Sequence, residues 1–313
     1  MGIDGGGSKT TAILCDLSEQ NIKSAVRGTG SYSMIGVDGI KELVLDILKE
    51  FSPGDSISEI QCATLSFAGI GREADKKKVY ESISEIGLNR INIFTDAEIL
   101  HYAAFGSNNG ILIESGTGAV CVYGIKENLK QLGGWGYLLG DEGGGYDMGR
   151  RAVRGALNDE NRARKRSKLT DALLKYYELS EPENLISVVY SSDNPQNFLA
   201  SSAELICSYA DEGDEEAIKI VGKVSAALVD LALSAIEMEE SEPPFRLACA
   251  GSLLENKTPV LKEFQSKLQD SEVEIDRVRI PMPPAAAGAK FAIESVGAEL
   301  PDSLYDKLCE INN

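Results

Sequence analysis

The sequence predicts an α/β fold built from two similar halves. Strand-like and helix-like segments alternate over the first hundred residues, and the same order begins again near Gly110. One kind of glycine-rich loop occurs twice, as Asp4-Gly5-Gly6-Gly7-Ser8-Lys9-Thr10 and as Glu114-Ser115-Gly116-Thr117-Gly118. Each copy follows a short apolar stretch and leads directly into another strand-like one. The repeated order and the repeated loop together indicate a duplicated scaffold.

Length and composition narrow the class of protein. The chain has 313 residues, 43% of them hydrophobic and 26% charged, which is typical of a globular protein with two domains. Its net charge of −18 disfavours nucleic acid or an anionic membrane as a partner, because their phosphates would be repelled. The six cysteines are widely spaced in apolar contexts, so we expect reduced thiols and a cytoplasmic location. A single histidine, His101, argues against a zinc site or a histidine-dependent triad.

The first half reads strand, strand, an optional third strand and a helix, followed by two strand–helix pairs. Apolar residues recur at helical spacing from Ile40 to Phe51, and Pro53-Gly54 ends that helix. Asp96 lies where a strand becomes a helix. The expected elements are strands 1–3 and 10–16, a polar turn at 16–21, helix 40–51, strand 62–67, helix 73–86, strand 91–94 and a helix from residue 97.

The second half repeats the strand–loop–strand unit and is then mostly helical. The boundary falls near the polar cluster at 105–110, which predicts domain 1–108 and domain 109–298, the second with a helical insertion. We expect a C-terminal helix at about 299–313 to pack back on the first domain. The expected elements are strands 111–113 and 120–123, helices 146–158, 168–178, 197–212 and 215–238, strands 245–249 and 273–280, and a helix from residue 285.

The first loop differs from two well-known nucleotide-binding loops. In the Walker loop and in the GxGxxG loop of dinucleotide folds the glycines lead into a helix, whereas Thr10 begins a strand-like stretch. A plain hairpin turn is the simplest alternative, but three consecutive glycines exceed what such a turn needs. They leave backbone N–H groups open to an anion, and Ser8, Lys9 and Thr10 add donors. Asp4 at the strand end is suited to hold Mg²⁺, directly or through water.

Three acidic residues and the only tryptophan each allow two interpretations. Asp96 is an N-cap aspartate, a general base that accepts the proton of an attacking hydroxyl, or both at once. Asp141 and Glu142 precede a helix in a glycine-dense segment, where they are either helix-dipole partners or acceptors for sugar hydroxyls. Trp135 is either a core aromatic or part of the wall of a site.

Five segments occur in a specific order along the chain: Asp4-Gly5-Gly6-Gly7-Ser8-Lys9-Thr10, Thr95-Asp96-Ala97, Ser115-Gly116-Thr117-Gly118, Gly133-Gly134-Trp135-Gly136 with Gly140-Asp141-Glu142-Gly143, and Ala250-Gly251-Ser252. Over roughly residues 1–290 they resemble the N-acetylglucosamine kinase family, within the BadF/BadG/BcrA/BcrD ATPase group of the actin/hexokinase/heat-shock-protein superfamily. The resemblance implies two ribonuclease-H-like (actin-like ATPase) domains with mixed β-sheets and an interdomain cleft that closes over ATP, and it implies a homodimer.

The resemblance also implies roles for individual residues. Asp96 is the general base on a sugar hydroxyl, and Asp4 lies near Mg²⁺. ATP contacts Gly5, Gly6, Gly7, Ser8, Lys9, Thr10, Ser115, Gly116, Thr117, Gly118, Ala250, Gly251 and Ser252. The sugar contacts Tyr32, Ser33, Asp96, Thr117, Gly134 and Asp141. These roles predict an ATP- and Mg²⁺-dependent kinase that acts on a small sugar or sugar acid.

Two departures from the family pattern leave the acceptor open. The acetylamino-sugar kinases carry an Asn and a Trp in the loop that here reads Ser31-Tyr32-Ser33-Met34-Ile35-Gly36, and a Ser at the position of Ala68. The candidate acceptors are an N-acetylhexosamine such as N-acetylglucosamine or N-acetylmannosamine, a hexose, or 2-keto-3-deoxygluconate. Two other classes stay open: an ATP-driven activator of a radical dehydratase, and a nucleotide-dependent binding or regulatory protein.

Overall fold

The computed structural model describes residues 1–51, 56–126, 128–161, 166–239 and 241–311. The chain divides into two compact units, of which unit 1 contains Met1–Gly106 and Ile280–Asn313 and unit 2 contains Ser107–Arg279. Each unit has its own sheet and its own hydrophobic core. Among the described residues, no helix is both long enough and apolar enough to cross a membrane.

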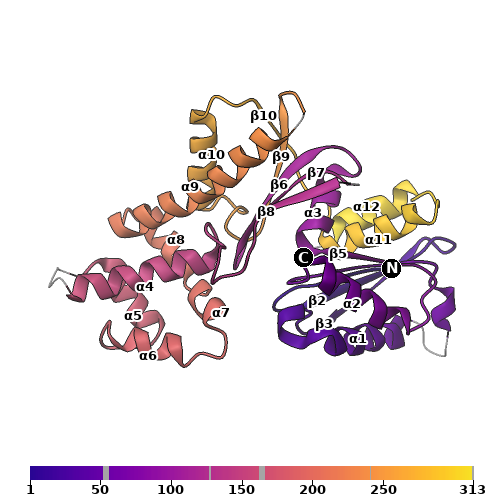
Figure 1. The fold of residues 1–313 in the computed structure, drawn as a ribbon, viewed down its shortest axis with the longest axis horizontal. Coiled ribbons are helices and arrows are strands. Elements are labelled where there is room, and N and C mark those ends of the chain that lie inside the picture. The colour runs from indigo at the N-terminus through magenta and orange to yellow at the C-terminus, as the bar shows by residue number, and fades with distance from the viewer. Residues whose placement is uncertain (52–55, 127, 162–165, 240, 312–313) are drawn as a thin grey trace. The chain divides into compact units, whose positions relative to one another are not determined.

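Unit 1 is built on a five-stranded mixed sheet with the order β3-β2-β1-β4-β5 (Figure 1). The strands β1, β2 and β3 are antiparallel neighbours, whereas β4 and β5 run parallel to β1. Because these three parallel strands end at one edge, Gly5, Phe67 and Thr95 are in register there. The elements of this unit are β1 Gly2–Gly5, β2 Thr10–Asp16, β3 Asn21–Arg27, α1 Tyr32–Phe51, the 3₁₀ helix Ser56–Glu59, β4 Ala63–Phe67, α2 Glu73–Ser84, β5 Ile91–Thr95, α3 Asp96–Phe105, α11 Pro284–Ser295 and α12 Asp302–Glu310.

Helices cover both faces of this sheet (Figure 1). On one face, α1 and α2 pack around Ile3 and Leu65. On the other face, α3, α11 and α12 form a second core that includes Ile13. The adjacent residues Ala12 and Ile13 of β2 enter different cores, because side chains alternate across a strand.

The helix α12 packs in unit 1, as expected for residues 299–313, but α11 also belongs to unit 1, which differs from the expected boundary at residue 298. The helix α11 approaches β1 at backbone distance, since a Cβ added at Gly2 would lie 2.2 Å from the carbonyl oxygen of Ala285. Small buried residues on α11, including Ala286 and Ala289, permit this approach. A run of small residues does not indicate which sheet it will cover, and this explains the difference from the sequence-based boundary.

Unit 2 repeats the sheet of unit 1. In its order, β10-β9-β6-β7-β8, three antiparallel strands (β6, β7 and β8) are again followed by two parallel ones (β9 and β10). The helices α4 to α9 lie in sequence between β8 and β9, where unit 1 has only α1 and the 3₁₀ helix between β3 and β4, so most of this helical segment is an insertion relative to unit 1. The elements are β6 Gly110–Ser115, β7 Ala119–Ile125, β8 Asn128–Gly133, α4 Gly145–Asn161, α5 Lys168–Tyr176, α6 Asn184–Tyr190, α7 Pro195–Ala200, α8 Ala203–Asp211, α9 Glu215–Met238, β9 Phe245–Ala250, α10 Pro259–Asp270 and β10 Ile275–Arg277.

Several elements differ from the sequence-based expectation. The segment expected as a loop at 31–36 starts α1, which is kinked at Gly36, whose φ of 65° and ψ of −173° interrupt the helical periodicity. The expected helix 197–212 consists of the two helices α7 and α8, and α6, α10 and β8 have no expected counterpart. The expected helix end at Pro53-Gly54 lies outside the described residues.

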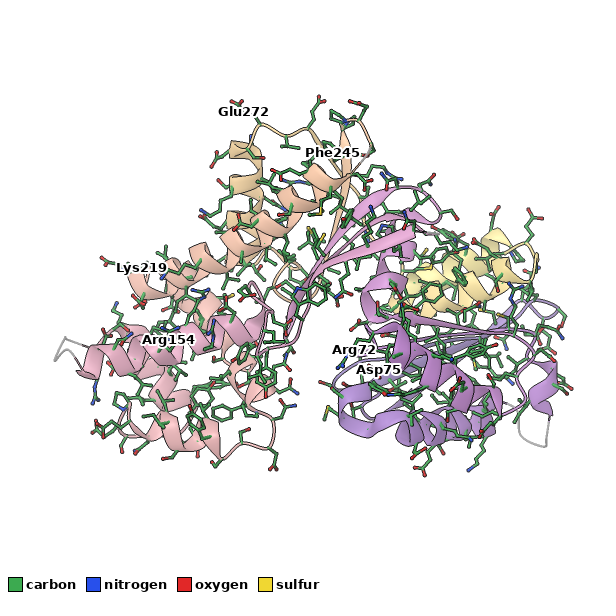
Figure 2. All side chains as sticks on the ribbon, in the orientation of Figure 1. Arg72, Asp75, Arg154, Lys219, Phe245 and Glu272 are labelled. Atoms are coloured by element: carbon green, nitrogen blue, oxygen red, sulfur yellow. The ribbon has the colours of Figure 1, made fainter. Side chains whose placement is uncertain are left out.

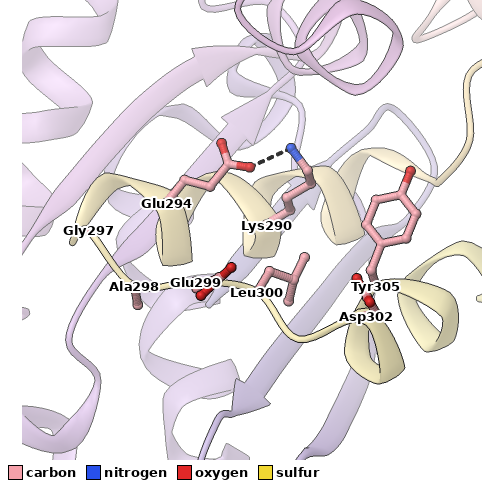
Figure 3. A pocket seen from close by; sticks show the side chains of 8 residues that line it. All are labelled: Lys290, Glu294, Gly297, Ala298, Glu299, Leu300, Asp302 and Tyr305. Atoms are coloured by element: carbon pink, nitrogen blue, oxygen red, sulfur yellow. Dashed lines mark ion pairs between the residues drawn. The ribbon is translucent and has the colours of Figure 1, made fainter.

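A cavity of about 510 Å³ lies in unit 1 beside α11 and α12 (Figure 3). Lys290 and Glu294 form an ion pair at 2.6 Å on its wall, and Tyr305 lines it from α12. None of the residues predicted for the functional site lines this cavity. The candidate site therefore has to be sought at the glycine loops.

Candidate active site

The loop of unit 1 joins β1 to β2 and is closed by a backbone hydrogen bond from the N–H of Gly6 to the carbonyl of Lys9 at 3.0 Å. Gly7, Ser8 and Lys9 form its exposed tip. A Cβ at Gly7 would have no heavy atom within 4 Å, and the φ of Gly7 is not positive, so the fold does not require glycine there. The missing side chain instead leaves the backbone N–H groups of the tip open to an anion.

Two other residues of this loop support the fold. Gly5 pairs with Thr10 across the hairpin, and a Cβ at Gly5 would lie 2.5 Å from the ring of Phe67. The Thr10 hydroxyl is buried and donates to the carbonyl of Gly28 at 2.8 Å. This hydroxyl is engaged within the protein, whereas Ser8 and Lys9 are exposed donors.

The loop of unit 2 joins β6 to β7 and is closed in the same way, by the N–H of Gly116 donating to the carbonyl of Gly118 at 3.0 Å. A Cβ at Gly116 would also have no heavy atom within 4 Å. The carbonyls of Gly116 and Thr117 accept the N–H groups of Gly145 and Tyr146, in the first turn of α4, at 2.8 and 2.9 Å. The start of α4 thus fixes the loop, while the side chain of Thr117 stays exposed.

The segment Ala250-Gly251-Ser252 lies beside this second loop. The strands β6 and β9 are parallel neighbours, with Glu114 in register with Ala250, so both segments leave the sheet at one edge. Gly251 has a φ of 89°, and a Cβ there would lie 2.3 Å from the carbonyl oxygen of Ser115. Unit 2 therefore brings together two of the segments predicted to contact ATP.

Asp141 also lies beside the second loop, Ser115 to Gly118, in unit 2. It is 7% exposed, it has a φ of 63°, and Gln196 of α7 donates to its Oδ2 at 3.2 Å. Burial raises the pKa of Asp141, while backbone N–H groups of Gly136 and Ala119 act in the opposite direction. A Cβ at Gly118 would lie 2.7 Å from Oδ2 of Asp141, so the carboxylate borders the loop directly.

The segment before Asp141 carries exposed apolar side chains. Trp135 is 62% exposed, which excludes the core-aromatic interpretation, and Leu138 and Leu139 are also exposed. Gly134 follows β8 with a φ of 66°, and a Cβ there would lie 2.8 Å from a methyl group of Val120. Gly134 is therefore required by the local backbone, whereas Trp135 remains accessible to a ligand.

Asp96 is the first residue of α3 in unit 1, and it does not cap the helix. The N-cap is Thr95, whose hydroxyl accepts the N–H of Glu98 at 3.0 Å while Glu98 accepts the N–H of Thr95 at 2.8 Å. The N-cap interpretation of Asp96 is therefore wrong. The Asp96 carboxylate accepts the N–H of Ala97 at 3.0 Å, and burial raises its pKa above the ordinary aspartate value. A carboxylate with a raised pKa is suited to accept a proton.

Asp4 lies on β1, close enough to Asp96 for their charges to interact. Burial and then the charge of Asp96 raise the pKa of Asp4 to about 7, while a hydrogen bond from Ser66 at 3.1 Å and the charge of Lys9 act to lower it. A divalent cation would relieve the repulsion between the two carboxylates. No group of three His, Cys, Asp or Glu side chains among the described residues is arranged to hold a metal ion. Asp4 therefore fits Mg²⁺ held by one or two carboxylates, water and phosphate oxygens.

Tyr32 and Ser33 are tied to the same sheet edge through Ala68. The N–H of Ala68 donates to the carbonyl of Gly5, and the carbonyl of Ala68 accepts the N–H of Tyr32, both at 2.9 Å. The Tyr32 hydroxyl donates to Asp75 at 3.1 Å, and Asp75 lies beside Arg72 at the start of α2 (Figure 2). Ser33 is exposed. Unit 1 therefore places Tyr32 and Ser33 next to the end of β1.

Three residues that touch the site were not among those predicted: Ser66, which donates to Asp4; Gln196, which donates to Asp141; and Glu98, which completes the capping box. The Thr-x-x-Glu spacing from Thr95 to Glu98 is a capping-box signature, so the sequence contained a signal for Glu98. Ser66 and Gln196 carry no such signal, because each contacts a residue that is distant in sequence.

A sequence profile decides the family. The profile described as the BadF/BadG/BcrA/BcrD ATPase family matches residues 1–292. The chain belongs to the BadF/BadG/BcrA/BcrD ATPase family. Membership of this family confirms the resemblance inferred from the five segments, and the two mixed sheets confirm the expected α/β fold class of the actin-like ATPases.

Relatives of this ATPase family member include two curated proteins. It is 29% identical to an N-acetyl-D-glucosamine kinase of Dictyostelium discoideum over 313 residues, which covers 94% of this chain and 98% of the relative. It is 28% identical to an N-acetylmuramic acid/N-acetylglucosamine kinase of Clostridium acetobutylicum over 275 residues, which covers 86% of this chain and 89% of the relative.

Solved structures of two proteins share the fold. A candidate N-acetylglucosamine kinase of Chromobacterium violaceum superposes with a TM-score of 0.76 at 21% identity, covering 93% of this chain and 97% of the other. A ROK family glucokinase of Streptomyces griseus, in complex with glucose and AMPPNP, superposes with a TM-score of 0.51 at 17% identity, covering 94% and 98%. At these identities the likeness concerns the fold.

Proposed function

We propose that this protein is an ATP-dependent sugar kinase that transfers the γ-phosphoryl group of ATP to a hydroxyl of an N-acetylhexosamine. The observation that carries the proposal is the Asp96 carboxylate, which is not used for capping and lies at the sheet edge where the parallel strands β1 and β5 end, at Gly5 and Thr95, with β4 between them. A candidate base and a phosphate-sized loop thus share one edge of one sheet. The names of the two curated relatives favour an acetylamino sugar as the acceptor.

ATP is assigned to the glycine loops. The loops Gly5 to Thr10 and Ser115 to Gly118 are assigned to the phosphates, through backbone N–H groups other than those of Gly6 and Gly116, which close the loops. Ala250 to Ser252 are assigned to the adenosine. Asp4 is assigned to Mg²⁺, which, when bound, neutralises charge on the phosphates. The exposed Lys9 adds a positive charge beside Asp4.

Each unit carries its own candidate contacts for the acceptor sugar. In unit 1 these are Tyr32, Ser33 and Asp96, which the backbone bonds of Ala68 and the strand register bring to one edge. In unit 2 these are Thr117, Gly134 and Asp141, which border the second loop. Carboxylates and hydroxyls are natural partners for sugar hydroxyls, since they form charge-assisted or neutral hydrogen bonds with them.

The transfer itself requires one proton acceptor. Asp96 accepts the proton of the attacking hydroxyl as the oxygen forms its bond to the γ-phosphorus, and the bond between that phosphorus and the bridging oxygen of ADP breaks. The products are a phosphorylated sugar and ADP. The raised pKa of Asp96 increases its proton affinity, which favours this transfer.

The activator of a radical dehydratase is a weaker alternative, because it needs accessible thiolates for an iron–sulfur cluster. Cys62, Cys121 and Cys207 are buried, and burial raises the pKa of Cys121 and of Cys249 to about 12. Thiols of this kind stay protonated and unreactive at neutral pH.

A coupled assay of ADP release across a panel of acceptors tests the proposed function. The panel contains N-acetylglucosamine, N-acetylmuramic acid, N-acetylmannosamine, glucose, 2-keto-3-deoxygluconate and a control without acceptor. We expect ADP release to depend on the acceptor and to be fastest with an N-acetylhexosamine. Release that is equal in all samples would indicate an ATPase without phosphotransfer to sugar. Release only with 2-keto-3-deoxygluconate or glucose would reassign the acceptor.

A further inference from the structure

We propose that Lys76 and Glu98 are positioning residues for Asp96. Through them, α2 fixes the proposed base relative to Tyr32, which is a proposed contact of the acceptor sugar. The inference rests on the proposed function, since it assigns a role to groups that act through the proposed base. Neither residue is needed for ATP or for the acceptor in the assignments above.

The ion pair between Lys76 and Glu98 joins α2 to the start of α3. Lys76 Nζ lies 2.6 Å from Oε1 of Glu98, and the two side chains are only 15% and 21% exposed. The other carboxylate oxygen of Glu98 accepts the N–H of Thr95, so the turn that carries Asp96 is held from both sides. A rigid turn of this kind fixes the direction of the Asp96 side chain.

Helix capping alone does not account for Lys76. A capping box needs only the Thr95 hydroxyl and the Glu98 carboxylate, whereas this one also receives an ammonium group from a different helix. Burial would lower the pKa of Lys76, but the carboxylates of Glu98 and Glu73 outweigh that effect and raise it, so the ammonium stays charged. Because a largely buried ion pair adds little net stability, its orienting effect is the more distinctive contribution.

Asp75, the residue before Lys76, connects α2 to Tyr32. Asp75 is 8% exposed and accepts the hydroxyl of Tyr32 at 3.1 Å. Asp75 and Lys76 are neighbours on α2. Asp75 contacts Tyr32, which is a proposed contact of the sugar, and Lys76 contacts Glu98 in the turn that carries the proposed base. A shift of α2 would move Tyr32 and Asp96 relative to each other, and displacements of about 1 Å can lower turnover roughly 100-fold.

A double-mutant cycle on kcat tests the inference, using the intact protein with ATP, Mg²⁺ and its best acceptor. We expect Lys76→Met to lower kcat about 10- to 100-fold with little change in the KM for ATP. In the Asp96→Asn background the same substitution should lower kcat no further, because there is no base left to orient. Lys76→Arg keeps the charge and should restore most of the activity.

Two further variants separate positioning from folding. Lys77→Met is a matched control on the same helix, since Lys77 is 76% exposed, and it should leave kcat unchanged. Glu98→Gln retains the capping box, which accepts Gln, but removes the charge, so it should lose kcat as Lys76→Met does even if the latter variant fails to fold.

The outcomes are distinguishable. Wild-type kcat in both Lys76→Met and Glu98→Gln would overturn the inference, as would an equal fold-loss in the presence and absence of Asp96. In either case Asp96→Asn would still lower kcat, so the assignment of the base and the proposed function would stand. Wild-type turnover of Asp96→Asn would overturn the assignment of the base and this inference with it.

Discussion

At Gly7 and Gly116 the fold does not require glycine, so the reason for glycine at these positions has to be sought in a ligand. Neither has a positive φ, and a Cβ at either position would have no heavy atom within 4 Å, so side chains larger than hydrogen would be sterically tolerated. Gly251 is different, because its φ of 89° and its contact with Ser115 require glycine for the backbone itself. Glycine at the two loop tips therefore points to a ligand that approaches the backbone closely.

Gly7→Ala should preserve stability and weaken ATP binding. We expect the free energy of unfolding to stay the same or to rise by up to about 1 kcal/mol, since Ala restricts the unfolded chain. The KM for ATP should rise roughly tenfold, because an extra methyl in close-packed space costs about 1–3 kcal/mol. Chemical denaturation and the ATP dependence of ADP release measure the two effects.

Gly251→Ala is the matched control for Gly7→Ala. It should lower the free energy of unfolding by more than about 1 kcal/mol, because Ala is strained at positive φ. A wild-type KM for ATP in Gly7→Ala would contradict the phosphate assignment of the loop.

Asp4→Asn should raise the requirement for Mg²⁺ without destabilising unit 1. Burial and the charge of Asp96 raise the pKa of Asp4 to about 7, so its ionised form is unfavourable in the fold and Asn removes that cost. Loss of the charge should raise the Mg²⁺ concentration for half-maximal turnover roughly 10- to 100-fold. Turnover titrated with Mg²⁺ after treatment with a chelator measures this, and an unchanged midpoint would show that Asp4 does not hold the ion.

At the residue scale, the sequence predicted the segments but not all of their partners. The loops, Asp96 and Asp141 could be proposed as site residues because each belongs to a short local pattern. The role of Thr10 could not be predicted, since its buried bond to Gly28 depends on chain geometry, whereas capping by Thr95 had a local signal in the Thr-x-x-Glu spacing. Gln196 was also beyond prediction, because α7 reaches Asp141 across 55 residues of sequence.

At the scale of elements, the two sheets follow one plan. Both have three antiparallel strands followed by two parallel ones, so the loop and the end of the neighbouring parallel strand come to one edge in each unit. The alternating patterns predicted most of these strands. The placement of α11 was not predictable from its own residues, because it depends on a long-range contact with β1.

Gly2→Ala should loosen the contact between α11 and β1. The added Cβ would lie 2.2 Å from the carbonyl oxygen of Ala285 and 2.3 Å from the nitrogen of Ala289, and these backbone atoms cannot rotate away. We expect a loss of about 3 kcal/mol or more in the free energy of unfolding, at the upper end for overpacked cores.

Gly288→Ala tests the same contact from the helix side. Its Cβ would come no closer than 3.3 Å to Gly2, so the loss should be clearly smaller, about 1 kcal/mol. Thermal unfolding of the two variants gives the comparison, and equal melting temperatures would show that backbone proximity does not govern this interface.

At the scale of the whole molecule, the chain has to bind an anionic nucleotide although its net charge is −18. Long-range attraction cannot supply this affinity, so we propose that it comes from local donors, namely backbone N–H groups of the two loops and a cation at Asp4. The repeated order of strands predicted the fold class, and it places one proposed set of donors at the corresponding loop of each half. The helical insertion of unit 2, which supplies Gln196, has no counterpart in unit 1 from which its contacts could be inferred.

The most direct test of the account is the turnover of Asp96→Asn with ATP, Mg²⁺ and the fastest acceptor, measured together with its affinity for ATP. We expect a loss of about 10²- to 10⁴-fold in kcat, the usual contribution of a positioned base, with ATP affinity unchanged. Turnover equal to that of the wild type, or ADP release that does not depend on sugar in either protein, would contradict it.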